Sequence, residues 1–258
     1  DVLLNQSLGK LNAVRDIFKA EYQSLRNNLR QLVLTDFIRK DFQIHLGDNS
    51  AQFTQLGVLS YFESIRREII EQSWTVPVAV LTGSLVIIPT SAKEHLERLI
   101  PNSRLSYDVI GQLSQEDYLK VSVSGSHHDL VTALTQLFQE GHIQVIIGTK
   151  SLLGEGWDAP CVNSLILASF VGSFMLSNQM RGRAIRVWPD NPNKTSNIWH
   201  LVSINLSPRR WFDFQDEEEK YDETLELQLY ALSPDLDLLD RRMTQFLGLH
   251  YTELTIES

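Results

Sequence analysis

Three arginines stand close together in an otherwise acidic chain, in the segment NQMRGRAIRVWPD at residues 178–190. If this segment is a helix, Gln179, Arg183 and Arg186 follow one another at spacings of four and three residues and project from one face. Two guanidinium groups and an amide on one face can neutralise a polyphosphate and orient an attacking water. The alternative is a solvated, salt-bridged helix surface, where most arginines of soluble proteins lie.

The same helix needs a surface to pack on. Met180, Ala184 and Val187 form a neighbouring apolar stripe, which we expect to seat the helix on a sheet. Gly182 lowers the helix propensity by roughly 1 kcal/mol relative to alanine. A glycine at such a position indicates that another group approaches the backbone closely.

A second segment, IGTKSLLGEGWDAP at residues 147–160, contains a loop that follows a buried strand. Thr149 is expected at the carboxyl end of that strand, which is the edge where parallel sheets bind ligands. Gly154 and Gly156 permit backbone conformations that other residues avoid. Asp158 can accept hydrogen bonds from ribose hydroxyl groups. The alternative is an ordinary strand-to-helix connection in which Asp158 caps the helix.

The remaining sequence alternates apolar runs with helical patterns, which predicts an α/β fold with a mostly parallel sheet covered by helices on both faces. The expected helices are residues 10–30, 58–73, 92–100, 129–141, 174–187 and 233–251, and the expected strands are residues 31–38, 76–83, 84–90, 118–125, 143–149, 162–169 and 196–204. We expect one domain at residues 1–207, with insertions at 41–75 and 84–126, and an acidic, mainly helical C-terminal extension at 208–258.

Charge is distributed unevenly along the chain. The net charge is −9, and residues 208–258 hold 5 Lys and Arg against 13 Asp and Glu, so the first 207 residues are nearly neutral with 18 against 19. A neutral body lacks the basic footprint of a passive nucleic-acid binder but can carry a local phosphate-binding strip.

The cysteine count and the first residue bear on the setting of the protein. Cys161 is the only cysteine, which excludes a disulfide framework and favours a reducing, cytoplasmic setting. No apolar run is long enough for a membrane span, and we expect a monomer with no membrane partner. Because the chain begins with Asp1, we expect it to be a segment of a longer protein.

Taken together, TKSLLGEGWDAP and QMRGRAIR resemble motifs V and VI of superfamily 2 helicases and translocases in order and spacing. The chain is most similar to the second RecA-like domain of DEAD/DEAH-type proteins related to the motor subunits of type III restriction enzymes, over residues 10–40 and 76–206. The resemblance implies that Arg183 and Arg186 are arginine fingers and that Gln179 lies near the γ-phosphate of ATP. It also implies that Gly156 and Asp158 meet the sugar of the nucleotide.

The resemblance further implies contacts with DNA or RNA. Thr149, with Lys150 beside it, would contact a nucleic-acid phosphate. Thr82, Gly83 and Thr35 lie at neighbouring expected strand ends and could join them, although this rests on their location only. For these three the alternative is a role as solvated turn residues.

A complete motor also needs a phosphate loop and an acidic Mg²⁺-binding motif. SLGKL at residues 7–11 has neither the preceding glycine nor the following Ser or Thr, and FQDEEEK at residues 214–220 follows no buried strand. We therefore expect this chain alone not to hydrolyse ATP, and we expect ATP and Mg²⁺ to bind together with an N-terminal RecA-like domain of the same parent protein.

The sequence thus favours the C-terminal motor domain of an ATP-dependent nucleic-acid helicase or translocase, in restriction or repair. One alternative is a non-hydrolytic interaction module that binds a phosphorylated or acidic partner. A sugar-nucleotide transferase domain also fits the fold class, but nothing specifies an acceptor pocket.

Other clusters are weaker candidates for function. His127 and His128 lack a third ligand at metal spacing, and we expect no metal site. Trp157 and Trp188 either stack on bases or pack in the core.

Overall fold

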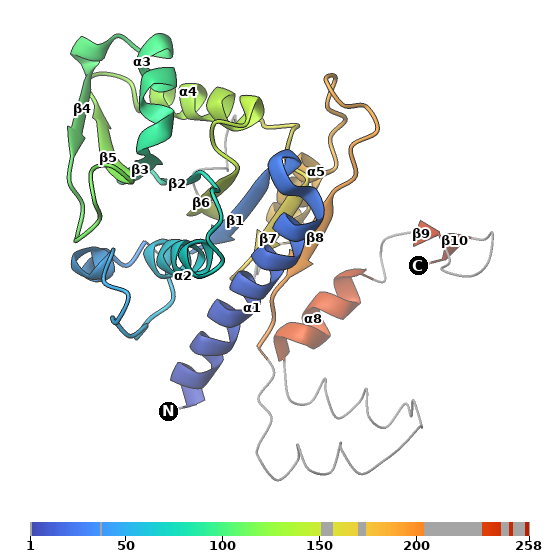
Figure 1. Cartoon of the computed structure of the whole chain (residues 1–258). Coiled ribbons are helices and arrows are strands. Elements are labelled where there is room, and N and C mark those ends of the chain that lie inside the picture. Colours follow the sequence, from blue (N-terminus) through green and yellow to red (C-terminus); the bar gives the residue numbers. More distant parts are fainter. Residues whose placement is uncertain are drawn as a thin grey trace. The chain divides into compact units, whose positions relative to one another are not determined.

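The computed structural model describes residues 2–36, 38–150, 157–169, 174–203, 234–243, 248–249 and 256–257. It divides into two compact units, Lys10–Leu201 and, separately, Asp1–Gly9 with Val202–Ser258. Within the first unit, the strands form one eight-stranded sheet in the order β4-β5-β3-β2-β6-β1-β7-β8 (Figure 1). The strand bounds are β1 Gln31–Thr35, β2 Val78–Leu81, β3 Val86–Pro89, β4 Leu105–Asp108, β5 Tyr118–Val123, β6 Val145–Thr149, β7 Ser164–Leu167 and β8 Asn197–His200.

The sheet has a parallel part and an antiparallel part. The strands β2, β6, β1, β7 and β8 are parallel neighbours. The strands β3, β5 and β4 continue the sheet in antiparallel pairing. All seven expected strands are present, but the short edge strand β4 was not expected. Its side chains are alternately half-buried and exposed, so its sequence carries no apolar run.

Helices cover both faces of this sheet. On one face, a buried apolar cluster contains Val33 and other strand residues packed against α1 (Val2–Leu25) and α2 (Val58–Glu71). The other joins Leu32 and Leu34 to α3 (Lys93–Leu99), α4 (His127–Glu140) and α5 (Phe174–Ala184). Successive residues of β1 therefore face opposite layers, as the two-residue period of a strand requires. The predicted fold class, a mostly parallel α/β sheet with helices on both faces, is confirmed.

Short 3₁₀ helices complete the connections: η1 Arg26–Asn28, η2 Lys40–His45, η3 Thr90–Ala92 and η4 Asn102–Arg104. Residues 41–75 contain α2, which covers the sheet, and residues 84–126 supply β3, β4, β5 and α3. Gly141 ends α4 in the left-handed conformation, with φ of 88°, as expected for a glycine that follows a helix.

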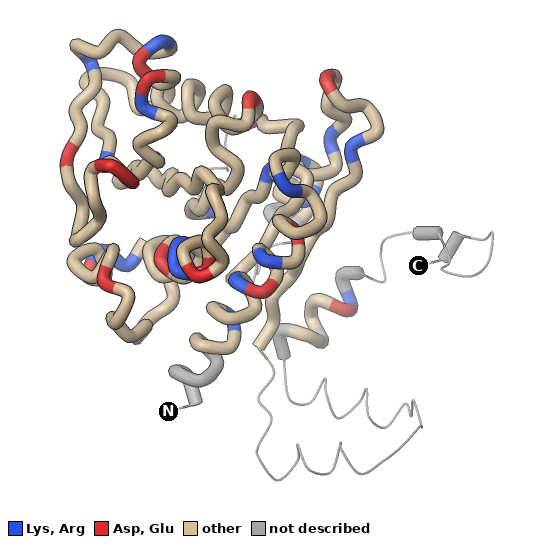
Figure 2. The backbone as a smooth tube through the Cα atoms, viewed as in Figure 1, with Lys and Arg blue, Asp and Glu red and all other residues tan. Residues whose placement is uncertain are grey.

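The helix α1 begins before the predicted start at residue 10 and ends at Leu25 rather than residue 30. Acidic and basic residues are mixed along α1, α2 and α3 (Figure 2), so these helices carry no field of a single sign. In the second unit, the described elements are α8 (Pro234–Met243) and the antiparallel pair β9 (Gly248–Leu249) and β10 (Ile256–Glu257). Among the described residues, no helix has the length and apolar character needed to cross a bilayer.

Candidate functional site

Polar side chains gather where the parallel strands β6, β1 and β7 end. Thr149 closes β6 and is the partner of Thr35, the last residue of β1. The hydroxyl oxygens of Thr35 and Ser169 lie 3.0 Å apart. The Lys150 ammonium lies 2.7 Å from a carboxylate oxygen of Asp36, and only 9% of the Lys150 side chain is exposed. We call these five residues the strand-end cluster.

Three members of the strand-end cluster, Thr35, Thr149 and Lys150, were predicted from the sequence. Asp36 and Ser169 were missed, although each directly follows an apolar strand-like run. Ser169 also accepts a hydrogen bond from the backbone N–H of Asp36 at 3.1 Å. The cluster therefore offers hydroxyl groups and one neutralised ammonium at the carboxyl edge of the sheet.

Thr82 and Gly83 lie in the tight turn between β2 and β3. The Thr82 hydroxyl donates to the Leu85 carbonyl at 2.9 Å and accepts from the Leu85 N–H at 2.9 Å. Thr82 is fully buried, whereas Gly83 is exposed. The Thr82 hydroxyl is therefore used within the turn.

The arginine-bearing helix α5 is shorter than predicted. It ends at Ala184, so Arg186 lies beyond the helix and not on the same helical face as Gln179 and Arg183. The Ala184 carbonyl accepts hydrogen bonds from the side chains of Lys194 and Ser196, and these take the place of the next helical N–H.

Packing of α5 agrees with the predicted stripe at two of its three positions. Met180 and Ala184 are buried in the core, but Val187 is 73% exposed because the helix has already ended. A Cβ atom added at Gly182 would meet no atom within 4 Å. The expected close approach to Gly182 is therefore not found within the described chain.

The two predicted motif segments meet at the end of α5. Arg186 Nη1 lies 2.6 Å from Asp158 Oδ1, with 54% and 53% of the two side chains exposed. Burial lowers the pKa of the Arg183 guanidinium, the charge of Arg186 lowers it further, and Asp158 opposes both effects. Arg183, Arg186 and Asp158 thus form one electrostatic group, which we call the arginine group. Gly156 lies outside the described residues.

The arginine group and the strand-end cluster lie at opposite ends of the strands. Ser169 follows the carboxyl end of β7. The Lys194 ammonium, by contrast, donates both to Ala184 at the end of α5 and to Val162 just before β7 begins. The helix α5 therefore returns along β7 to its amino end. From the sequence, the strand-end residues were expected to contact nucleic acid and the arginines to contact the nucleotide, and these two sets lie at opposite ends of the strands.

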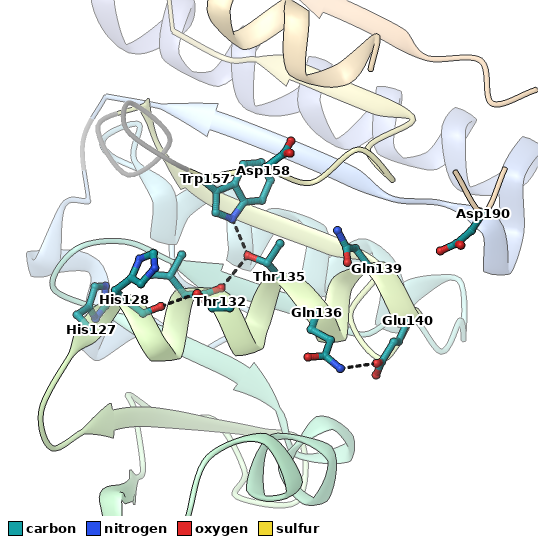
Figure 3. Close-up of a pocket in the computed structure, with 11 residues that line it drawn as sticks. His127, His128, Thr132, Thr135, Gln136, Gln139, Glu140, Trp157, Asp158 and Asp190 are labelled. Atoms are coloured by element: carbon teal, nitrogen blue, oxygen red, sulfur yellow. Dashed lines mark hydrogen bonds between the residues drawn. The ribbon is translucent and has the colours of Figure 1, made fainter. Parts of the chain in front are cut away.

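A groove of about 840 Å³ lies between α4 and the segment that contains Trp157 and Asp158 (Figure 3). Trp157 is buried at its side, and its indole N–H donates to the Thr135 hydroxyl at 2.8 Å. Trp157 and the partly buried Trp188 both pack with the core. Packing is therefore the observed role of both tryptophans.

The groove is acidic. Its described lining contains the carboxylates Glu140, Asp158 and Asp190 and no lysine or arginine. Asp158 is paired with Arg186, and the carboxylates of Glu140 and Asp190 would repel a phosphate group placed in the groove. In the part of the chain that the structure describes, no three His, Cys, Asp or Glu side chains are grouped to hold a metal ion.

Comparisons with known proteins give similarities of fold only. No family model matches the chain, and no curated protein matches it. Similar solved structures include the C-terminal part of the Fun30 ATPase domain, with 13% identity, a TM-score of 0.41 and coverage of 92% of this chain and 53% of that one. The helicase domain of Hef from Pyrococcus furiosus has 14% identity, a TM-score of 0.38 and coverage of 81% and 28%. The DUF1998 helicase MrfA bound to DNA has 12% identity, a TM-score of 0.40 and coverage of 96% and 27%.

This chain thus spans about half the length of the first of these chains and little more than a quarter of the other two. At such identities and TM-scores, the function has to be argued from the residues of this chain.

Proposed function

We propose that this chain is the second RecA-like domain of an ATP-dependent nucleic-acid helicase or translocase. In this proposal its arginine group completes an ATP site whose phosphate loop and Mg²⁺ ligands lie on an N-terminal RecA-like domain of the same parent protein. The observation that carries the proposal is the contact of Arg186 with Asp158 at 2.6 Å, because it joins the two segments that resemble motifs V and VI.

The arginine group fits a polyphosphate in charge and in exposure. Arg186 is half exposed, so its guanidinium can reach an anion that approaches from another domain. An exposed ion pair contributes about 0–1 kcal/mol, so replacing Asp158 by a phosphate costs little. Arg183, the penultimate residue of α5, adds a second cation in the same field.

Bound ATP would supply a phosphoryl group for transfer to water. Arg183 and Arg186 would neutralise the charge of the phosphate oxygens, and the exposed Gln179 on α5 would orient the water. Asp158 would accept a hydrogen bond from a ribose hydroxyl once Arg186 has turned to the phosphates. All four residues lie at or near the C-terminal half of α5 and the segment that packs beside it.

The strand-end cluster supports a separate contact with nucleic acid. Hydroxyl groups and lysines at strand ends are common donors to phosphate oxygens, which position a protein on DNA or RNA without reading sequence. Ser169, which is partly exposed, carries such a hydroxyl, and Thr35, Thr149 and Lys150 lie buried at the same strand ends. Because this cluster is at the other end of the strands, nucleic acid and nucleotide would not compete for one place.

The test uses the longest natural polypeptide that contains these residues. Steady-state ATP hydrolysis is measured alone and with single- and double-stranded DNA and RNA. We expect at least one of these nucleic acids to stimulate turnover, and Arg186→Ala to lower that turnover by roughly 10³-fold, the effect typical of an arginine finger.

Arg104→Ala is the matched control for this test. Arg104 forms an ion pair with Asp129 at 2.7 Å, also between partly exposed side chains, but far in sequence from the arginine group. Its turnover should stay at the wild-type value. Turnover that no nucleic acid stimulates, or that survives in Arg186→Ala, would contradict the motor proposal and favour the module that binds an acidic partner.

A further inference from the structure

The Lys194 side chain reaches back from the turn after α5 to three oxygen atoms. Its ammonium lies 2.6 Å from the Val162 carbonyl, 2.6 Å from the Ala184 carbonyl and 3.0 Å from the Ser196 hydroxyl. The Ser196 hydroxyl in turn lies 2.7 Å from the Ala184 carbonyl and 3.0 Å from the Val162 carbonyl. An ammonium has three donors, and here each of them has an acceptor.

The two carbonyls belong to the two segments that carry the arginine group. Ala184 lies between Arg183 and Arg186, at the last turn of α5. Val162 lies shortly after Asp158 and closes a turn with Ala159, whose carbonyl accepts from the Val162 N–H at 3.2 Å. One ammonium therefore ties the Arg186 segment to the Asp158 segment.

Electrostatics favour a cation at this position. The end of a helix carries a partial negative charge, which a lysine stabilises, and hydrogen bonds from a charged donor are about twice as strong as neutral ones. Burial lowers the pKa of Lys194, so holding the ammonium here costs solvation free energy. The three short hydrogen bonds offset that cost.

We infer that Lys194, assisted by Ser196, is a positioning residue for the arginine group. By binding the carbonyls of Ala184 and Val162, it holds the backbone of the Arg186 segment at a fixed distance from the backbone of the Asp158 segment, while the Arg186 side chain stays free to turn from Asp158 to a phosphate. This inference rests on the proposed function, because it assigns Lys194 to the same ATP site without contact with the nucleotide.

The first test measures amide hydrogen exchange in this chain, which needs no nucleotide. In Lys194→Met, we expect exchange in peptides that cover residues 157–163 and 181–188 to accelerate roughly tenfold or more, because the clamp limits local opening there. Exchange in α2 and β6 should not change. Lys40→Met, at an exposed lysine of η2, is the control and should leave every peptide unchanged. Unchanged exchange at residues 157–163 and 181–188 in Lys194→Met would overturn the inference.

The second test measures ATP hydrolysis by the longest natural polypeptide that contains these residues. We expect Lys194→Met to lower kcat by roughly 10- to 100-fold, the range for a small displacement of a catalytic group, while KM for ATP stays within about twofold. If the loss of turnover equals the loss of folded protein measured by circular dichroism, so that turnover per folded molecule is unchanged, a positioning role is contradicted.

Arg186→Ala, measured in parallel, separates the two proposals. If Arg186→Ala abolishes turnover and Lys194→Met does not change kcat, the clamp inference fails and the proposed function stands. If Arg186→Ala turns over like the wild type, the proposed function itself fails.

Rescue provides the last check. In Lys194→Cys, treatment with 2-bromoethylamine alkylates the new thiol and restores an ammonium on a side chain of the same length. Cys161 is fully buried, and burial raises the pKa of its thiol to about 12, so it should stay unmodified. We expect the modified protein to recover slow amide exchange at residues 157–163 and 181–188, and to recover kcat. Recovery of neither would contradict the inference.

Discussion

The contact of Asp158 with Arg186 matters for placement more than for stability. Both side chains are half exposed, and water and salt screen such a pair strongly. The buried carboxylate of Glu63 is the opposite case, because it accepts hydrogen bonds from Arg66 at 2.8 Å and 2.6 Å and from Arg67 at 3.0 Å.

This contrast gives a prediction about unfolding. Asp158→Ala should change the free energy of unfolding of the chain by less than about 1 kcal/mol. Glu63→Ala should lower it by about 3–5 kcal/mol, because it leaves the buried guanidinium of Arg66 without its carboxylate partner. Urea denaturation measures both. A large loss of unfolding free energy in Asp158→Ala would show that the ion pair with Arg186 stabilises the fold, and would contradict its exchange for a phosphate.

Some residues of the candidate site could be identified from the sequence and others could not. Spacing and residue type singled out Arg183, Arg186 and Asp158, and the structure brings these three into one electrostatic group. Lys194 and Ser169 could not be found in this way. Their roles depend on oxygen atoms more than thirty residues away or on a neighbouring strand, and only the folded backbone brings these together.

The end of α5 shows how tertiary contacts override local pattern. The apolar period continues to Val187, and the periodicity therefore predicted a longer helix. The side chains of Lys194 and Ser196 bind the Ala184 carbonyl from outside the helix, and the chain leaves the helical path there.

Gly182 offers a test at this helix. A Cβ atom would meet no atom within 4 Å, so Gly182→Ala should raise the free energy of unfolding by up to about 1 kcal/mol. Thermal and urea denaturation measure the change. If the variant is stabilised but its parent protein loses ATP turnover, another domain approaches the glycine closely. A destabilised variant would contradict the open surroundings seen at Gly182.

The contact between α3 and the end of α4 predicts a dependence of stability on pH. The rings of His95 and His142 stack with centroids 3.4 Å apart. Burial lowers the pKa of His142, the charge of His95 lowers it further, and Glu140 acts in the opposite direction. A pKa below that of the unfolded chain, about 6.5, means that the unfolded state binds the proton more tightly. The stability contribution is therefore present above the unfolded pKa and is lost as the pH falls through the lower folded pKa.

Urea denaturation at about pH 7.5 and about pH 5.5 tests this dependence. The free energy of unfolding should fall with acidification, and His142→Gln should make that fall smaller. His128→Gln, at an exposed histidine of α4, is the control and should keep the wild-type difference. An equal fall in all three proteins would assign the pH effect to other groups.

For the molecule as a whole, alternation of apolar runs and helical periods was sufficient to predict the fold class and the parallel strands. The antiparallel edge strand β4 was missed because its residues are only partly buried, which leaves no apolar run. The separation of the strand-end cluster from the arginine group follows from α5, which runs back along β7 as a helix between two parallel strands must.

The central claim is that Arg186 acts on the phosphates of ATP at a site shared with another domain. Single-turnover hydrolysis of bound ATP by the longest natural polypeptide that contains these residues tests this most directly, because it separates binding from chemistry. The account predicts that Arg186→Ala slows the hydrolytic step by roughly 10³-fold while the dissociation constant for ATP changes by less than about tenfold. A hydrolytic step as fast as that of the wild type would contradict the account.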